Sequence, residues 1–411
     1  MAPIEDVIEQ MRTGGMAILV DDERRENEGD LIFAAEHVSP EKINFLATKG
    51  RGLICVPLSE QRADELNLIQ MVGEDQNTEA QGTSFTVSVD VKAGTTTGIS
   101  AHDRAATVKA LCNNRSRSSD FNRPGHIFPL RAREGGVLRR AGHTEATVDL
   151  ARLAGMQPIG VLCEIMDEDG TMARLPRLFE FGREHNLPVA SIQDLIRYRQ
   201  SREKIVQCTA RTVLPTACGK FDMHLYETTY SNESHLALVC GPVAGKSDVL
   251  VRVHSSCLTG DALGSLRCDC RYQLNTAMQM VQQEGLGVVV YLNQEGRGIG
   301  LAPKIKAYAL QDKGLDTIQA NLELGFAGDE REYGVGIQIL KDLGLSSVRL
   351  LTNNPKKVDA FIYGGYGLSV TEQVPLEQDP NDYNRRYLET KREQMGHRLF
   401  KVGEQDKQEI K

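Results

Sequence analysis

The sequence predicts a mixed α/β protein of two domains, each a mixed sheet with flanking helices. At 411 residues the chain exceeds one ordinary hydrophobic core, so two domains are expected. Short β-branched runs alternate with helical patterns in both halves, which is typical of α/β architecture. A helix signal followed by a polar stretch near residue 200 marks the boundary, and we therefore expect domains at 1–200 and 201–411.

Three segments of the first half carry clear element signals. The apolar run Met16–Val20 predicts a strand, and Thr144–Leu153 predicts a helix. A second helix is expected to begin after Ser191, which would act as N-cap with Asp194 facing back to it. This helix should continue to about Arg202 and close the first domain.

The second half shows the same alternation. Gly287–Leu292 and Val348–Thr352 predict buried strands. After the second of these, Asn354 is a plausible N-cap and Pro355 is suited to the first helical position. These signals predict strand-to-helix turns at which ligands often bind.

Composition excludes several classes of protein. The net charge of −8 argues against a broad nucleic-acid surface. No window has the apolar length of a membrane span, and 1–16 lacks the apolar core of a secretory signal. The nine cysteines are an odd number spread along the chain, which does not suit a disulfide framework. We expect a cytoplasmic protein that binds neither membranes nor nucleic acids.

The segment Val251–Gln273 gathers Cys257, Cys268 and Cys270. Three thiolates suit zinc, and a catalytic zinc takes three protein ligands where a structural zinc takes four. Three cysteines without an obvious fourth ligand therefore suggest zinc-activated hydrolysis. His254 as a fourth ligand would instead make the site structural, and spacing alone also leaves a metal-free cluster open.

The acidic run Asp21–Asp30 follows the first predicted strand. Its carboxylates and arginines suit a hard cation with a phosphorylated substrate, although a solvated charged loop is the more frequent meaning of such a run. Gly94–Gly98 could offer N–H groups and hydroxyls to an anion. His126 and His143 each follow an arginine and a glycine in separate predicted loops, the second at an expected helix N-terminus.

Further candidate sites follow the strands of the second half. Asn293–Gly300 is a glycine-rich loop with an arginine, suited to phosphate, although a plain turn is more common. Thr352 and Lys357 lie at a strand end and a helix start, where phosphate is also held. Gly328–Tyr333 offers a carboxylate and an arginine two residues apart, or simply a surface turn.

The motifs DDERRENEGDL, RGLICVPLS, GTTTGIS, RPGHIFPLRA and RAGHTEA, in this order over residues 1 to 200, resemble 3,4-dihydroxy-2-butanone 4-phosphate synthase. That family converts ribulose 5-phosphate to the butanone phosphate and formate with Mg²⁺ or Mn²⁺. The resemblance implies metal ligands at Glu26 and His143. It implies acid and base roles at His126 and Glu164, leaving their order open. The implied substrate contacts are Arg25, Glu26, Asp30, Arg140, Ala141, Gly142, His143, Thr144 and Glu164, with Cys55 nearby.

The motifs RVHSSCLTGDALGSLRCDC, NQEGRGIGL, GLDTIQANLELGF, DEREYG and LTNNPKK, over residues 208 to 400, resemble GTP cyclohydrolase II. That family opens the imidazole ring of GTP and releases formate and pyrophosphate. The resemblance implies Zn²⁺ on Cys257, Cys268 and Cys270, with His254 not a ligand, and Mg²⁺ assisting with GTP. The implied GTP contacts are Arg252, Val253, His254, Ser255, Ser256, Gln273, Glu295, Gly296, Arg297, Thr317, Thr352 and Lys357.

The same resemblance gives three residues chemical roles. It implies Asp329 as the general base, Arg331 as the nucleophile toward the α-phosphate, and Tyr308 near the base. One departure stands out, since many members of the family carry an acidic or amide residue at the position of Ser256.

Two motif sets on one chain predict a bifunctional enzyme of riboflavin biosynthesis, a lyase joined to a hydrolase. Its expected partners are ribulose 5-phosphate and GTP, and both regions imply homodimers. In one alternative only one half is active and the other serves as a dimerisation scaffold. A further alternative is a zinc-containing GTP-binding module without catalysis.

Overall fold

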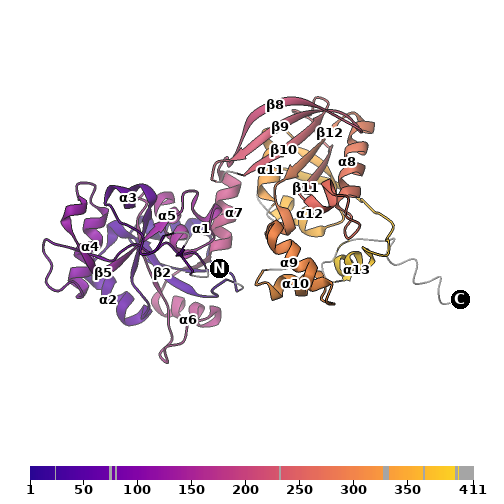
Figure 1. Ribbon diagram of the computed structural model, residues 1–411. Helices are drawn as coiled ribbons and strands as arrows, with labels where there is room; N and C mark the ends of the chain where they lie inside the picture. The colour runs from indigo at the N-terminus through magenta and orange to yellow at the C-terminus, as the bar shows by residue number, and fades with distance from the viewer. Residues whose placement is uncertain are drawn as a thin grey trace. The chain divides into compact units, whose positions relative to one another are not determined.

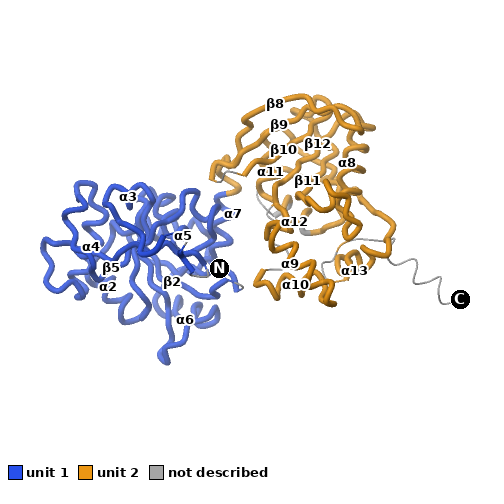
Figure 2. Tube along the Cα trace, viewed as in Figure 1, with its two compact units in different colours: residues 1–199 blue, residues 200–411 orange. Residues whose placement is uncertain are grey.

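The computed structural model describes residues 1–23, 25–73, 76–78, 81–230, 233–326, 333–363, 366–393 and 397. It divides into two compact units, Met1–Arg199 and Gln200–Lys411 (Figure 2). Each unit contains a seven-stranded mixed sheet with helices packed on it (Figure 1), so the predicted fold class is confirmed. No helix of the described residues is long and apolar enough to cross a membrane.

The first unit alternates strands with helices along its length. Its strands are β1 (Ala17–Val20), β2 (Gly29–Ala34), β3 (Cys55–Ser59), β4 (Val89–Val91), β5 (Phe121–Ala132), β6 (Gly160–Glu164) and β7 (Val189–Ser191). Its α-helices are α1 (Ile4–Arg12), α2 (Pro40–Phe45), α3 (Glu60–Glu65), α4 (Ala101–Cys112), α5 (His143–Leu153), α6 (Leu175–His185) and α7 (Ile192–Arg202).

The first sheet has the order β4-β5-β3-β6-β2-β1-β7 and is buried on both faces. Alternate residues of β2 point to opposite faces, so Leu31 and Phe33 join one core cluster while Ile32 joins the other. Helices α2, α4 and α6 supply apolar residues to the first cluster. Helices α1, α5 and α7 supply them to the second, which makes three layers.

The second unit begins with a long hairpin and continues as alternating strands and helices. Its strands are β8 (Val206–Thr216), β9 (Gly219–Thr228), β10 (Ser234–Cys240), β11 (Val249–Ser255), β12 (Gly287–Leu292), β13 (Ser347–Leu351) and β14 (Ser369–Val374). Its α-helices are α8 (Cys270–Glu284), α9 (Leu301–Gln311), α10 (Thr317–Glu323), α11 (Gly334–Asp342), α12 (Pro355–Tyr363) and α13 (Arg385–Glu393).

The second sheet has the order β14-β13-β11-β12-β10-β9-β8. Strands β14, β13, β11 and β12 run parallel, whereas β12, β10, β9 and β8 pair antiparallel. Helix α8 packs on β11 and β12 and contributes Ala277 and Val281 to the core. The parallel strands end at loops that carry the cysteine cluster and the glycine-rich segment, so the candidate ligands gather at one edge of the sheet.

Most predicted elements are found close to their expected positions. The Ser191 hydroxyl accepts a hydrogen bond from the backbone N–H of Asp194 at 3.0 Å, as expected for the start of α7. The strand 287–292 is found as predicted, while the strand expected at 348–352 lies one residue earlier. The division between the two units falls within α7, after Arg199.

One prediction is wrong in kind, because His126 lies within β5 rather than in a loop. The pairing of β4 with β5 shifts between Val89 and Asp90, which accommodates Arg123–His126 as an irregularity of the strand. Gly125 packs so closely on β4 that an added Cβ would lie 2.0 Å from the carbonyl carbon of Val89. The proline and glycine therefore serve this bulge rather than a turn.

Candidate active sites

The loop between β1 and β2 is organised by Asp21. One Asp21 carboxylate oxygen accepts from the backbone N–H of Glu26 at 2.9 Å and from the Arg25 guanidinium at 3.0 Å. The other accepts from the N–H of Glu28 at 2.8 Å. The side chain of Asp21 is 1 % exposed, so these three bonds fix the loop that presents Glu26.

Glu26, His143 and Asp21 form a cluster whose ligand atoms all lie within 4.8 Å of one another. His143 begins α5, and its Nδ1 lies 3.6 Å from Glu26 Oε2. Burial lowers the pKa of His143, but the carboxylates of Asp30, Glu26 and Asp21 outweigh it and raise the pKa to about 9. Burial raises the pKa of Glu26, but His143 and Arg25 lower it to about 2. Without a metal ion, the charges of the two carboxylates Asp21 and Glu26 are thus offset by the His143 imidazolium and the Arg25 guanidinium.

The sheet register aligns the remaining candidates of this unit in one row. Asp30 on β2 is paired with Leu19 on β1 and with Glu164 on β6. Glu164 accepts from the backbone N–H of Leu53 at 2.8 Å. Burial raises the pKa of Asp30 to about 7, and Glu164 adds to that rise while His143 opposes it.

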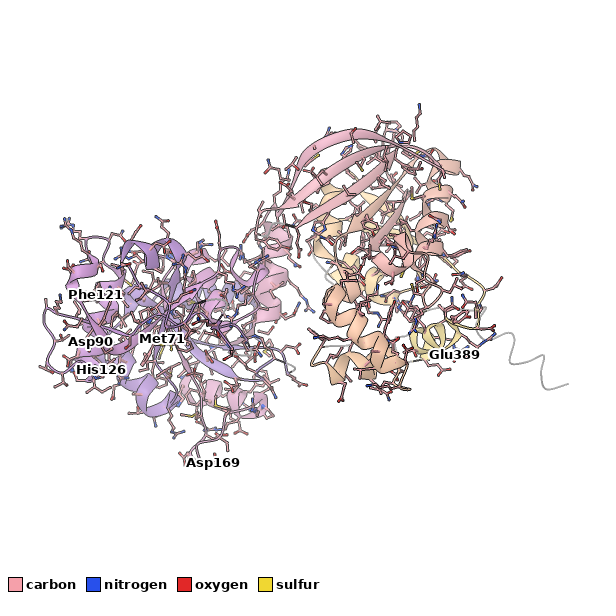
Figure 3. All side chains as sticks on the ribbon, in the orientation of Figure 1. Met71, Asp90, Phe121, His126, Asp169 and Glu389 are labelled. Carbon is pink, nitrogen blue, oxygen red and sulfur yellow. The ribbon has the colours of Figure 1, made fainter. Side chains whose placement is uncertain are left out.

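His126 lies further along the same row. Cys55 is paired both with Phe128, two residues after His126, and with Leu162, two residues before Glu164. His126 and Glu164 thus lie on β5 and β6, the two strands that flank β3 in the sheet. The His126 ring contacts Asp90 on β4, with Nδ1 and Oδ2 2.7 Å apart (Figure 3).

Arg140 is held firmly by protein groups. Its guanidinium donates to Glu145 at 2.6 Å, to the Thr83 hydroxyl at 2.8 Å and to the Gln81 carbonyl at 3.0 Å. Gly142 leaves room for this side chain, because an added Cβ would lie 2.3 Å from Arg140 Nη1 and would displace the guanidinium. Ala141 beside them is exposed, while Thr144 is buried in the first turn of α5.

Two further predicted features of this unit are engaged by the protein itself or buried. The Gly94–Gly98 loop already wraps a carboxylate, since Asp103 accepts from the N–H groups of Thr96 and Gly98 and from the Thr96 hydroxyl. The Asp103 carboxylate of the protein therefore occupies the position expected for a bound anion. Cys55 is 1 % exposed, and burial raises the pKa of its thiol.

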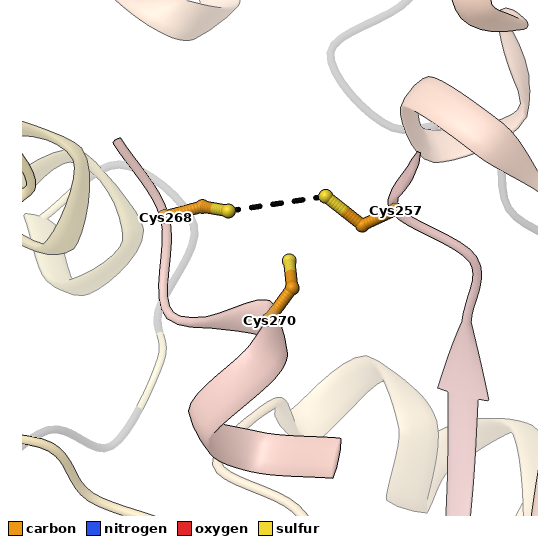
Figure 4. Close-up of side chains that lie close together, drawn as sticks. All are labelled: Cys257, Cys268 and Cys270. Carbon is orange, nitrogen blue, oxygen red and sulfur yellow. Dashed lines mark hydrogen bonds between the residues drawn. The ribbon is translucent and has the colours of Figure 1, made fainter. Parts of the chain in front are cut away.

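In the second unit, Cys257, Cys268 and Cys270 converge as predicted (Figure 4). Their sulfur atoms lie within 4.8 Å of one another, and those of Cys257 and Cys268 are 3.8 Å apart. Cys257 follows β11, and Cys270 begins α8. Neighbouring thiols and Lys304 hold the pKa of Cys257 well below its usual range, so this sulfur is poised as a thiolate.

His254 does not join the three cysteines in the described residues. Its Nε2 faces the carboxylate of Asp261, 3.2 Å from each oxygen, and its ring stacks on Tyr291 at 5.6 Å between centroids. Burial lowers the pKa of His254, although Asp261 opposes this. Three sulfur donors with no protein fourth ligand among the described residues suit a zinc ion with one open position.

An open cavity lies against the three cysteines, whose side chains form part of its wall. The predicted residues that line it are Ser255, Ser256, Cys257, Cys268, Cys270, Glu295, Gly296, Arg297, Tyr308 and Thr317. Gly296 and Arg297 have φ values of 63° and 64°, so the glycine-rich loop turns sharply after β12.

Other predicted GTP contacts are not among the lining residues described. Arg252, 5 % exposed, donates to the Leu351 carbonyl at 2.8 Å and to Gln273 Oε1 at 2.5 Å. Lys357, 4 % exposed, donates to the Val253 carbonyl at 2.7 Å. His254 and Thr352 are also buried. The structure therefore places these side chains in the interior of the second unit, bonded to other protein groups in the case of Arg252 and Lys357. The predicted Asp329 and Arg331 lie outside the described residues.

Ser256 and Glu295 fix the two loops that frame the cavity. The Ser256 hydroxyl accepts from the backbone N–H of Gln294 at 3.1 Å, at the start of the glycine-rich loop. Glu295 accepts from the N–H of Leu258 at 2.6 Å and from Lys304 at 2.7 Å. Serine at this position thus has a defined role as a short acceptor.

Sequence reasoning missed several residues that complete these sites. Lys304 donates to Cys257 Sγ at 3.1 Å, and Tyr387 lines the cavity. Asp21 belongs to the acidic run Asp21–Asp30, but the sequence did not predict that it organises this loop. No local signal marks the two others, because their neighbours come from distant parts of the chain.

Comparison with known families supports the same two regions. Residues 5–198 match the family model of 3,4-dihydroxy-2-butanone 4-phosphate synthase, and residues 207–375 match that of GTP cyclohydrolase II. Fold, sites and family models together define a two-domain enzyme, a lyase followed by a hydrolase.

The full-length relatives give the particular family. The chain is 55 % identical to the riboflavin biosynthesis protein RibBA of Aquifex aeolicus (strain VF5) over 397 residues, covering 96 % of this chain and 97 % of that protein. It is 54 % identical to the RibBA of Bacillus mycoides (strain KBAB4), covering 96 % and 98 % of the two chains. The chain belongs to the RibBA family of riboflavin biosynthesis proteins.

A solved structure resembles both units. The crystal structure of RibBX from A. baumannii, described as a two-domain 3,4-dihydroxy-2-butanone 4-phosphate synthase, matches with a TM-score of 0.72 and 37 % identity. It covers 90 % of this chain and 100 % of that one.

Proposed function

We propose that the two activities of this bifunctional enzyme reside in separate units with separate metals. Residues 1–200 would convert ribulose 5-phosphate to 3,4-dihydroxy-2-butanone 4-phosphate and formate. Residues 201–411 would hydrolyse GTP to the diaminopyrimidinone phosphate, formate and pyrophosphate. The observation that carries the proposal is the pair of chemically different clusters, carboxylate with imidazole in one unit and three thiols in the other.

Magnesium or manganese suits the cluster of the first unit. Glu26 and His143 offer a carboxylate oxygen and an imidazole nitrogen, and Asp21 holds their loop in place. When bound, the cation would supply Lewis-acid stabilisation for an enediolate. Glu164 ends β6 and His126 lies in β5, and these strands flank β3 in the sheet, which supports their assignment as acid and base of one site.

The substrate phosphate and hydroxyls need cationic and hydrogen-bonding groups around that metal. We assign these roles to Arg25, Asp30, Thr144 and the Arg140–His143 loop. Arg140 is already bonded through each guanidinium nitrogen, so it would contribute mainly charge and loop geometry unless substrate displaces a partner.

Zinc suits the cluster of the second unit. Cys257, Cys268 and Cys270 would hold it, and when bound it would supply Lewis-acid activation of water for hydrolysis. Glu295 and Arg297 face the adjoining cavity, which supports their assignment as GTP contacts. Asp329 and Arg331 keep their proposed roles of general base and phosphate-directed nucleophile, on resemblance alone.

The remaining proposals concern the state of the enzyme in the cell. We propose a cytoplasmic homodimer that uses two small-molecule substrates, with Mg²⁺ accompanying GTP. The nine cysteines are all free thiols in the structure, as a reducing compartment would keep them.

A paired assay on metal-replete full-length protein tests the proposal. Formate should appear from ribulose 5-phosphate with Mg²⁺ present and, separately, from GTP in a zinc-containing sample. Metal analysis should return about one zinc per chain. Formate from only one substrate would support the less favoured alternative, in which one unit is a scaffold, and formate from neither would refute the proposal.

A further inference from the structure

The last described helix, α13, docks on the segment that carries two of the three cysteines. It lies at residues 385–393, beyond the 207–375 region that matches the cyclohydrolase family model. Lys391 Nζ donates to Asp269 Oδ1 at 2.6 Å, and Asp269 stands directly between Cys268 and Cys270. Lys391 is 7 % exposed and Asp269 is 3 % exposed, so this is a buried ion pair.

The geometry of Asp269 shows that its carboxylate serves this contact. Asp269 occupies the N-cap position of α8, where aspartate usually accepts from backbone N–H groups of the first turn. Here its side chain makes no such bond and instead accepts from Lys391 and from Gln273 Nε2 at 2.7 Å. The Asp269 carboxylate therefore contacts Lys391 of α13 instead of capping the N-terminus of α8.

A continuous hydrogen-bonded chain leads from α13 to β11. Lys391 donates to Asp269, Gln273 donates to the same carboxylate, and Arg252 donates to Gln273. Arg252 and Gln273 are both proposed GTP contacts. Through this chain, α13 can set the position of the zinc ligands and of the nucleotide anchors together.

Tyr387 supplies a second, independent contact with the site. It precedes Lys391 by one helical turn, so the two side chains share a face of α13. Tyr387 lines the cavity, with Arg297 Cζ 5.7 Å and Lys391 Nζ 4.5 Å from its ring centroid. These distances suit cation–π contacts, which would hold Arg297 toward the cavity.

The segment leading to α13 is anchored as well. The Asn353 amide donates to the Leu376 carbonyl at 2.6 Å and accepts from the Leu376 N–H at 2.8 Å. The Tyr272 hydroxyl on α8 donates to the Glu377 carbonyl at 2.8 Å. The chain from β14 to α13 is therefore attached to the second unit at several points before Lys391.

We propose that α13 is a working part of the GTP site, with Lys391 as a positioning residue for the zinc-ligand segment and Tyr387 as a wall of the nucleotide cavity. This inference rests on the proposed function of the second unit. It predicts that loss of Lys391 leaves the buried Asp269 carboxylate beside two zinc ligands with the Gln273 hydrogen bond but without its cationic partner.

The test compares Lys391→Met with Arg392→Met in the full-length chain. Arg392 is the matched control, because it is adjacent on α13 and donates to the exposed Glu393. Lys391→Met should lose zinc to a competing chelator at least about tenfold faster than the control and lower GTP turnover by a similar factor, since a buried charge-assisted bond is lost. Equal zinc loss and equal turnover in the two variants would overturn the proposal.

A double variant separates a positioning role of Lys391 from unfolding of the second unit, and two variants of Tyr387 test its role in the cavity wall. Lys391→Met combined with Asp269→Asn removes both charges of the ion pair, and it should recover part of the zinc retention lost in Lys391→Met. If the single variant does not fold, judged by circular dichroism of the full-length chain, the double variant compared with Arg392→Met decides by zinc loss. Tyr387→Ala should raise KM for GTP more than Tyr387→Phe, because the phenyl ring keeps the wall.

The proposed function can fail separately. If the unsubstituted chain releases no formate from GTP, the assignment of the second unit fails. If that chain is active and Lys391→Met behaves as Arg392→Met, only the role of α13 fails.

Discussion

Lys304 offers the sharpest single-residue test of the second site. Its ammonium lies 3.1 Å from Cys257 Sγ and 2.7 Å from Glu295 Oε1, and its side chain is 11 % exposed. Burial lowers the pKa of Lys304, but Glu295 and Cys257 outweigh it and raise the pKa above its usual range. Lys304 therefore stays charged and offsets the negative charge of the Cys257 thiolate.

We predict the effect of Lys304→Met from the bonds that remain. Glu295 keeps two backbone donors, from Leu258 at 2.6 Å and from Gly296 at 2.9 Å. Cys257 keeps the N–H of Gly260 at 3.3 Å. The net loss is therefore close to one hydrogen bond between charged groups, about 1.5–3 kcal/mol, or roughly 10- to 150-fold.

The assay measures kcat/KM for GTP and zinc affinity by chelator competition. Lys306→Met is the matched control, because Lys306 is exposed on the same helix. Lys304→Met should fall by the predicted factor in at least one of the two quantities, and turnover of ribulose 5-phosphate should be unchanged. A variant within about threefold of Lys306→Met in both quantities would refute the reasoning.

Three other predictions follow from buried polar contacts. Asp21→Asn should lower turnover of ribulose 5-phosphate by about tenfold or more while GTP turnover stays constant. The reason is that an amide cannot accept all three hydrogen bonds that fix the acidic loop. Equal loss of both activities would contradict this prediction. Burial lowers the pKa of His235 to about 4, so below pH 6.5 the unfolded chain binds more protons than the folded chain. The free energy of unfolding should therefore fall by about 3 kcal/mol as the pH drops from above 6.5 toward 4. Denaturant unfolding should show this loss, and His235→Asn should abolish it; an unchanged pH dependence would speak against it. Arg199→Met should destabilise the first unit by about 3–5 kcal/mol. The substitution leaves the Asp149 carboxylate, which is 1 % exposed, without the guanidinium that lies 2.7 Å away. An unfolding midpoint equal to that of the unsubstituted chain would contradict this prediction.

Local signals were sufficient for much of the fold. The N-cap at Ser191 is formed by neighbours in the sequence, so the start of α7 could be predicted within one residue. The unbroken apolar run of Gly287–Leu292 predicts a strand that is buried on both faces, and the structure contains this strand. The convergence of Cys257, Cys268 and Cys270 also followed from short spacing on either side of one loop.

Long-range packing decided what the sequence could not show. His126 lies in a strand because β4 absorbs the bulge around Gly125, which no residue near His126 signals. The glycine-threonine loop looked ready for an anion, but Asp103 at the start of α4 already occupies it. Likewise Lys391 is separated from Asp269 by 122 positions, so its contact exists only in the folded chain.

The central claim is that one chain holds two independent active sites. Its most direct test measures formate from ribulose 5-phosphate and from GTP in two full-length variants, Glu26→Ala and Cys268→Ala. We predict that Glu26→Ala abolishes the first reaction and spares the second, while Cys268→Ala removes zinc and the second reaction and spares the first. Loss of both activities in either variant, or of neither in both, would contradict the claim.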